Sequence, residues 1–266
     1  MTAIFSRSAV LWTIVVFDLV FLALPTLIVL VTSVTAGDMI SFPPQGFSLK
    51  WYLALIERDD FHSAFLRSIY VATLCTAIAI PVGTLAAIAM IRYRIRCYTL
   101  LQIYFLLPFT VPLVVSGVSM MILFGRLGWL GQIWPVGLAL CIINLPFMIW
   151  AVSASVNQLD RDLEDAAANC GAPPIQTFFT VTLPAVIPGI VTGALLMFVL
   201  AVNEFVVSLF LVDKRIVTLP VEIFLSVRDV VTPDVSAISV VYVIIALAAI
   251  WMLDRLVGLD VFLKSR

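Results

Sequence analysis

The sequence DLEDAAANCGAPPIQTFFTVTLP (residues 162–184) has a polar, acidic head inside an otherwise apolar chain, and its pattern decides how the fold around it is interpreted. Asp160 and Asp162 stand where a helix N-cap belongs, and the alanines at 166–168 favour a helix. Gly171 suits the C′ position, where the backbone takes a left-handed conformation. The proline pair that follows suits the first turn of another helix. The segment is therefore predicted to be a short helix, a glycine turn and a second helix.

Two further features of this segment bear on whether it has a function. Glu164 and Asp165 fall in the first turn of the predicted helix, where acidic side chains stabilise the positive end of the dipole. A connection of roughly thirty residues is long for a compact bundle, and such loops are usually functional or disordered. The alanine-rich sequence argues against disorder, which leaves a functional segment or an ordinary polar connector.

The composition of the whole chain indicates a membrane protein. Of its 266 residues, 63% are apolar and only 12% are charged, and the mean hydropathy is +1.17. Soluble domains carry about 25% charged residues, so the solvent for much of this surface is expected to be lipid. The net charge of −1 argues against a nucleic-acid-binding surface, which needs clustered Lys and Arg.

Six apolar stretches are long enough to cross a bilayer, which takes about 20 residues as a helix. They cover approximately residues 9–34, 64–91, 99–124, 129–155, 185–212 and 237–259. The first is too long for the apolar region of a signal peptide, which runs about 7–15 residues. The sequence thus predicts an all-α, polytopic protein with six transmembrane helices in one membrane domain (1–266), and prolines 108, 112 and 146 are expected to kink spans.

Orientation follows from basic residues in short loops. Arg92, Arg94 and Arg96 form the tightest cluster, between the second and third spans. The positive-inside rule places that loop in the cytoplasm. Both termini and the segment at 160–184 are then also predicted to be cytoplasmic.

The inventory of reactive residues does not predict an enzyme. The four cysteines at 75, 97, 141 and 170 are scattered and match neither a disulfide framework nor metal-ligand spacing. The single histidine, His62, cannot complete a convincing catalytic triad. No G-x-x-x-x-G-K-[ST] motif is present, so no ATP site of that kind is expected. If the protein works by ATP, another subunit must bind it.

Within residues 160–184, seven positions follow the pattern Glu-Ala-Ala, three residues, Gly, nine residues, Ile-x-Leu-Pro. They are Asp165, Ala166, Ala167, Gly171, Val181, Leu183 and Pro184, with Asp in place of Glu and Val in place of Ile. This pattern resembles the signature of the membrane subunits of ATP-binding-cassette (ABC) importers. In that family the segment is a coupling helix that docks on the ATPase, which implies this role for these seven residues.

The resemblance also implies a fold, partners and a location. The fold is that of type I ABC importer permeases (MetI-like), in a multi-pass protein of the bacterial inner membrane. The implied partners are ABC ATPase subunits that bind the ATP, a second homologous permease, an extracytoplasmic substrate-binding protein and the lipid bilayer. The stretches FSLKWY, RYRIR, LPF and LPVEIFLSVRDVVTPDVSAIS resemble the spermidine/putrescine branch. That branch often carries Asp-Asp where this chain has Asn203-Glu204.

Glu204 lies deep in the apolar run LMFVLAVNEFVVSLFLV. A charge at mid-bilayer costs about 2.5–3.5 kcal/mol on insertion scales, and such residues usually mark a transport route. Together with Asn203 and Ser208, Glu204 is predicted to form a polar spot on the substrate pathway, suited to a cation. The alternative is a neutral, hydrogen-bonded acid with a structural role. Gly189 and Gly193 predict close packing of the same helix against a neighbour. Asp18, nearer the end of its span, is interpreted as structural.

Other functions remain open from sequence alone. For an ABC importer permease, the open substrates are a polyamine, an opine, an amino-acid derivative or another small solute. A different class is an ion-coupled secondary transporter that uses Glu204, although no convincing internal repeat supports it. An intramembrane enzyme would need a richer catalytic inventory. Co-purification with an ATPase and a second permease distinguishes these classes.

Overall fold

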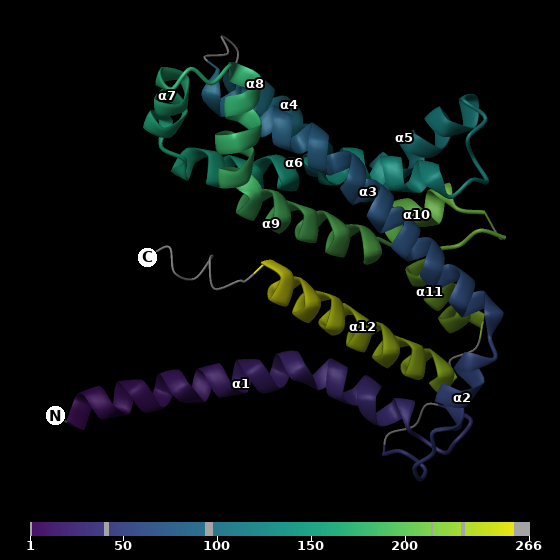
Figure 1. Cartoon of the computed structure of the whole chain (residues 1–266). Coiled ribbons are helices and arrows are strands. Elements are labelled where there is room, and N and C mark those ends of the chain that lie inside the picture. The colour runs from purple at the N-terminus through teal and green to yellow at the C-terminus, as the bar shows by residue number, and fades with distance from the viewer. Residues whose placement is uncertain (1, 40–42, 94–97, 214, 230–231, 258–266) are drawn as a thin grey trace. The chain divides into compact units, whose positions relative to one another are not determined.

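The computed structural model describes residues 2–39, 43–93, 98–213, 215–229 and 232–257. Arg94, Arg96 and Cys97 lie outside them, as does the C-terminal end of the sixth predicted span. The described part is helical, with two isolated β-bridges, Thr35 with Phe47 and Asp213 with Ile216. Its elements, in chain order (Figure 1), are α1 Thr2–Ser33, α2 Lys50–Ile56, α3 Asp59–Arg92, α4 Tyr98–Thr110, α5 Leu113–Arg126, α6 Trp134–Gln158, α7 Arg161–Asn169, α8 Pro174–Thr177, the π-helix η1 Phe178–Thr182, α9 Leu183–Val202, α10 Val206–Leu211, α11 Leu219–Asp229 and α12 Pro233–Val257.

The predicted membrane helices are largely present, with two differences. Four described helices are long and apolar enough to cross a membrane: Val10–Ser33, Asp59–Arg92, Trp134–Gln158 and Pro174–Val202. The third predicted span is instead a pair of helices, α4 and α5, that meet at 93°. The fifth predicted span is also interrupted, between Val202 and Val206, and the sixth lies in α12, Pro233–Val257. The all-α membrane fold is confirmed, while the third span is broken rather than kinked.

Proline explains the break between α4 and α5. Pro112 is the N-cap of α5 and has extended dihedrals, φ −53° and ψ 132°. Proline has no N–H to donate and disfavours the helical conformation of the residue before it, so α4 ends before Val111. Pro108 and Pro146 instead lie inside α4 and α6.

The chain divides into two compact units. Unit 1 comprises Met1–Phe61 and Ile223–Ala248, and unit 2 comprises His62–Glu222 and Ala249–Arg266. In unit 2, α6 and α9 lie side by side (Figure 1). A Cβ added to Gly189 would lie 2.8 Å from the carbonyl oxygen of Ala151, and one added to Gly193 would collide with Met148. The close packing that these glycines predict is therefore confirmed, and α6 is the neighbour.

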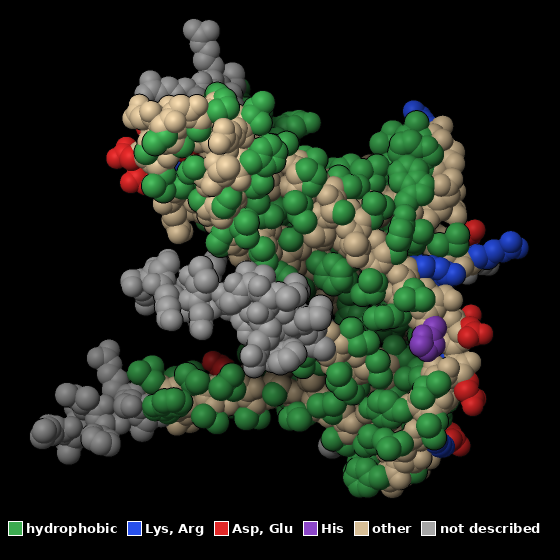
Figure 2. Space-filling view, in the orientation of Figure 1, with side chains coloured by type: hydrophobic (Ala, Val, Ile, Leu, Met, Phe, Trp, Pro, Cys, Tyr) green, Lys and Arg blue, Asp and Glu red, His purple; other side chains and the backbone are tan. Residues whose placement is uncertain are grey.

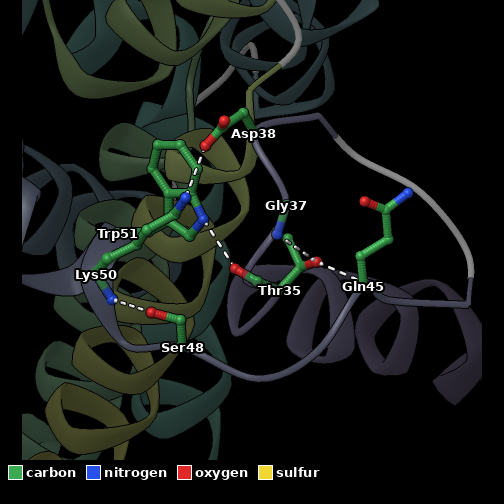
Figure 3. A network of polar contacts seen from close by, with 7 residues as sticks. All are labelled: Thr35, Gly37, Asp38, Gln45, Ser48, Lys50 and Trp51. Carbon is green, nitrogen blue, oxygen red and sulfur yellow. Dashed lines mark hydrogen bonds and ion pairs between the residues drawn. The ribbon is translucent and has the colours of Figure 1, made fainter.

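Polar contacts organise unit 1 at the C-terminal end of α1. Thr32 donates to Ser236 of α12 at 3.1 Å, and Ser33 shares a 2.7 Å hydrogen bond with Tyr52 of α2. In the turn that follows, the Thr35 carbonyl accepts from the Trp51 indole at 3.0 Å, and the Thr35 hydroxyl accepts from the backbone of Gly37 and Gln45 (Figure 3). These contacts fix the connection between α1 and α2.

Candidate functional site

Helix α7 begins where the sequence predicts. The side chain of Asp160 accepts a hydrogen bond from the backbone N–H of Asp162 at 3.0 Å, as an N-cap does. Figure 2 shows acidic side chains gathered where α7 lies, at one end of unit 2. The short helix of the predicted segment is therefore formed and capped.

The glycine turn is also present and has the full hydrogen-bond pattern of a Schellman motif. Gly171 has φ +86°. Its N–H donates to the carbonyl of Ala168 at 2.9 Å, and the N–H of Ala172 donates to that of Ala167 at 3.0 Å. These are the two bonds that close a helix through a left-handed residue. A Cβ at Gly171 would meet no other atom within 4 Å, so glycine is required here by its backbone conformation and not by crowding.

The second helix continues into the membrane instead of stopping before the fifth span. Pro174 begins α8, the π-helical turn η1 follows, and α9 continues from it, so that Pro174–Val202 is one apolar helix. Pro184 lies in the first turn of α9. Since proline has no N–H and crowds the carbonyl four residues earlier, the wider π turn accommodates it within a continuous helix. The fifth span therefore starts earlier than the predicted residue 185.

The seven signature residues of this segment differ in their exposure. Asp165, Ala166, Gly171 and Pro184 are exposed, whereas Ala167, Val181 and Leu183 are partly buried. Three large apolar side chains beside them are also exposed: Leu163 (54%), Ile175 (75%) and Phe179 (60%). The segment thus presents an apolar surface with acidic residues among it, a composition suited to contact with another protein.

A polar network that sequence reasoning missed joins this segment to two membrane helices. Arg92, the last residue of α3, forms an ion pair with Glu164 of α7, with 3.3 Å between Nε and Oε2. The other oxygen of Glu164 accepts a 2.5 Å hydrogen bond from the hydroxyl of Thr182, at the start of α9. In the sequence, these residues are 72 and 18 positions from Glu164, and no local pattern links them.

The second candidate site is a break in the fifth span. Helix α9 ends at Val202 and α10 begins at Val206. One oxygen of Glu204 accepts from the N–H of Val207 at 2.8 Å, and the other accepts from the N–H and the hydroxyl of Ser208 at 2.9 and 3.1 Å. Glu204 therefore caps α10, satisfying N–H groups that have no partner within the helix.

The structure brings two of the three predicted pathway residues together. Glu204, which is partly buried, binds Ser208, which is buried. Asn203 is exposed, and its side-chain amide donates back to the carbonyl of Val199 at 2.8 Å. The assumption of one continuous helix through Glu204 is wrong, because Asn203 ends α9. Gly193 and Met197 are buried in α9.

The two broken spans contact one another. Gly117 of α5 lies so close to α10 that an added Cβ would be 2.7 Å from the Phe210 ring and 3.4 Å from the Cα of Val207. Interrupted helices in transporters place polar backbone groups near the centre of the membrane. Here the helices that follow the two interruptions, α5 and α10, pack against each other.

Comparison with known sequences gives one family and several relatives. Residues 79–259 match the model of the family described as "Binding-protein-dependent transport system inner membrane component". The chain is 31% identical over 240 residues to the putrescine transport system permease protein PotI of Escherichia coli K12, covering 86% of this chain and 84% of that protein. It is 30% identical over 250 residues to the spermidine/putrescine transport system permease protein PotC of Haemophilus influenzae, covering 94% and 95%. A molybdenum transport system permease protein, ModB of Mycobacterium bovis, is 31% identical over 211 residues, covering 73% and 79%.

Solved structures with the same fold are more distant in sequence. A bacterial alginate ABC transporter bound to its periplasmic protein matches with a TM-score of 0.77 at 15% identity, covering 96% of both chains. The MetNI methionine ABC transporter matches with a TM-score of 0.63 at 18% identity, covering 79% of this chain and 98% of that one.

Proposed function

Because the chain belongs to the family of binding-protein-dependent transport system inner membrane components, we propose that it forms half of the path by which a polyamine or related organic cation crosses the membrane. It is a multi-pass, inner-membrane permease subunit of an ABC importer with the type I fold, and it is not itself an enzyme. Family membership excludes the alternative of an ion-coupled secondary transporter.

The segment at 160–184 is proposed to couple the chain to an ABC ATPase, which binds the ATP. Its signature residues Asp165, Ala166, Ala167, Gly171, Val181, Leu183 and Pro184 are proposed to shape this contact. Support comes from the capped helix and the Schellman turn, which together hold the exposed Leu163 and Ile175 in a defined arrangement. This segment is proposed to be part of a single permease domain that spans residues 1–266.

The proposed orientation places both termini and this segment in the cytoplasm. Its support is the ion pair between Arg92 and Glu164, because the loop after α3 and the loop after α6 must lie on the same side of a membrane for these residues to meet. Arg92 belongs to the basic cluster that the positive-inside rule assigns to the cytoplasm. On the opposite side, a substrate-binding protein is proposed to deliver the solute.

A second, homologous permease is the proposed partner within the membrane. Most side chains of α1 between Val10 and Leu30 are exposed in the chain by itself, although they are large and apolar. Lipid and a second permease are the two surroundings that such a helix requires. The pathway would then lie between the two permeases.

The observation that carries the polyamine assignment is the similarity to the spermidine/putrescine permease over 94% of this chain. Glu204 supplies a local reason, because a carboxylate offsets part of the hydration that a cation loses in a low-dielectric path. With Asn203 and Ser208 it is proposed to line that path. The second candidate is a different small solute, favoured by the 31% identity to the molybdenum permease, equal to that of the putrescine permease PotI, over a smaller share of the chain.

One experiment tests the function. The importer is purified through a tag on this chain, reconstituted in proteoliposomes with its binding protein, and assayed for ATP-dependent uptake of radiolabelled putrescine. We expect an ATPase and a second permease to co-purify, and putrescine uptake to be competed by spermidine but not by molybdate. Purification without an ATPase would refute the proposed coupling. Putrescine uptake that is inhibited by molybdate but not by spermidine would favour the second candidate, a different small solute, over a polyamine.

A further inference from the structure

Glu164 is engaged at both carboxylate oxygens by elements outside its own helix. Thr182 donates to one oxygen, and the Arg92 guanidinium lies beside the other. By contrast, the hydrogen bond that the Asp160 side chain accepts comes from the first turn of its own helix. Glu164 therefore connects α7 both to the end of α3 and to the start of α9.

Arg92 holds the segment at a second point. Its guanidinium donates to the carbonyl of Leu159 at 3.1 Å, immediately before the N-cap of α7. From the other direction, Arg161 donates to the carbonyl of Ile91 at 3.3 Å. The end of α3 and the beginning of α7 are thus joined by reciprocal contacts.

The burial of this network distinguishes it from an ordinary surface ion pair. Exposed pairs contribute little because water screens them. Here the side chain of Arg92 is only 11% exposed and that of Glu164 22%, and Thr182 is buried. Removing one partner leaves the other charge poorly solvated, so the two are expected to depend on each other.

We propose that Arg92, Glu164 and Thr182 form a clamp that makes α7 move as one body with the ends of α3 and α9. The inference rests on the proposed function, since it assigns these three as positioning residues that carry the ATPase's motion into the membrane helices. A docked helix attached only through its flexible connections would move without displacing the spans. The clamp supplies the rigid connection that such coupling requires.

The physical clamp is tested on the purified importer without substrate, by hydrogen–deuterium exchange of the α7 amides. Glu164→Gln keeps the acceptor for Thr182 and removes the charge that faces Arg92, and we expect about tenfold faster exchange. Thr182→Val should act in the same direction and Thr182→Ser should restore slow exchange, because serine retains the hydroxyl. Glu57→Gln, a matched loss of charge at an exposed residue of unit 1, should have no effect. Unchanged exchange in both Glu164→Gln and Thr182→Val would overturn the clamp.

The role in coupling is tested by ATP hydrolysis with and without putrescine-loaded binding protein. We expect Glu164→Gln to retain basal hydrolysis and to lose about tenfold in stimulated hydrolysis. Adding Glu164→Gln to Arg92→Gln should cost less than Glu164→Gln costs alone, because the pair is already broken. Independent, additive losses or normal stimulation would refute the transmission role. If no ATPase is present in the complex, the proposed function itself has failed, which is a separate result.

Discussion

Glu164 and Glu204 are both acids at the start of short helices, but the residues that they contact lie at different distances along the chain. Glu204 contacts residues three and four positions ahead in the chain, on the helix that it caps. Glu164 instead contacts residues of other elements, Arg92 at the end of α3 and Thr182 immediately before α9. Loss of Glu204 should thus disturb one short helix and the path beside it, whereas loss of Glu164 should loosen the attachment of a whole segment. The following changes test this contrast between the coupling segment and the broken span.

Gly171→Val should have the largest effect on coupling. A β-branched residue is strained at φ +86°, so the Schellman turn should be lost and the coupling surface misdirected. We expect transport and substrate-stimulated ATP hydrolysis to fall about tenfold, since left-handed backbone costs roughly 1–2 kcal/mol per residue. The measurement is stimulated hydrolysis in the assembled complex.

Gly128→Val is the matched control for that change. Gly128 also has positive φ (+72°) and no atom within 4 Å of an added Cβ, but it lies outside the coupling segment. It should cost similar stability and leave coupling intact. If both variants lose coupling equally, general destabilisation explains the loss at Gly171.

Glu204→Gln should have the next largest effect, on transport and not on coupling. Glutamine keeps one acceptor for the α10 cap and removes the charge, so putrescine uptake should slow about tenfold or less while basal ATP hydrolysis is retained. Glu204→Ala should add a loss of stability of about 1 kcal/mol by removing the cap. Equal uptake by wild type and the Gln variant would make the acid purely structural.

Asp160→Ala should have a moderate effect confined to α7. Loss of an N-cap side chain costs about 0.5–2 kcal/mol, so the first turn of α7 should exchange its amides faster while the clamp holds the rest. Hydrogen–deuterium exchange mass spectrometry measures the first turn and the rest of α7 separately. Faster exchange across all of α7, equal to that of Glu164→Gln, would show that the cap and the clamp are not separate.

Ser208→Ala should have the smallest effect. It removes the hydroxyl that donates to the carboxylate and to the main-chain carbonyl of Glu204 and leaves both backbone bonds to the carboxylate, for a loss of about 0.5–1.5 kcal/mol at most. Uptake should remain within about twofold of wild type, as measured in the same proteoliposomes. A loss as large as that of Glu204→Gln would instead assign the hydroxyl a direct part in the path.

The distance in sequence between contacting residues explains which features the sequence predicts and which it does not. The N-cap of α7, the glycine turn and the close approach at Gly189 follow from residues within a few positions of one another. The clamp was not predicted, because no pattern pairs Arg92 with Glu164 before the chain folds. Arg92 was interpreted only as an indicator of orientation, and Glu164 only as an acid near a helix dipole.

The broken spans show a different limit. Hydrophobic residues flank Asn203-Glu204 on both sides, so the run was interpreted as one helix. Asn is also a residue that favours helix ends, but the hydropathy of the run outweighs that signal. Likewise Pro112 predicts a kink but not the size of the 93° bend, after which α5 packs against α10, a helix distant in the sequence.

The π turn at Phe178–Thr182 has a consequence for helical phase. Each residue of an α-helix advances the side chains by about 100° around the axis, and a π turn contains one residue more than the α turn that it replaces. That additional residue determines the direction, around the axis of α9, in which the Ile175 side chain points. Deletion of Thr180 within η1 would rotate this side chain by roughly 100° about the helix axis while Phe179, Val181 and Thr182 are kept. If this segment has the proposed coupling role, the length of the turn sets the direction in which Ile175 faces the ATPase.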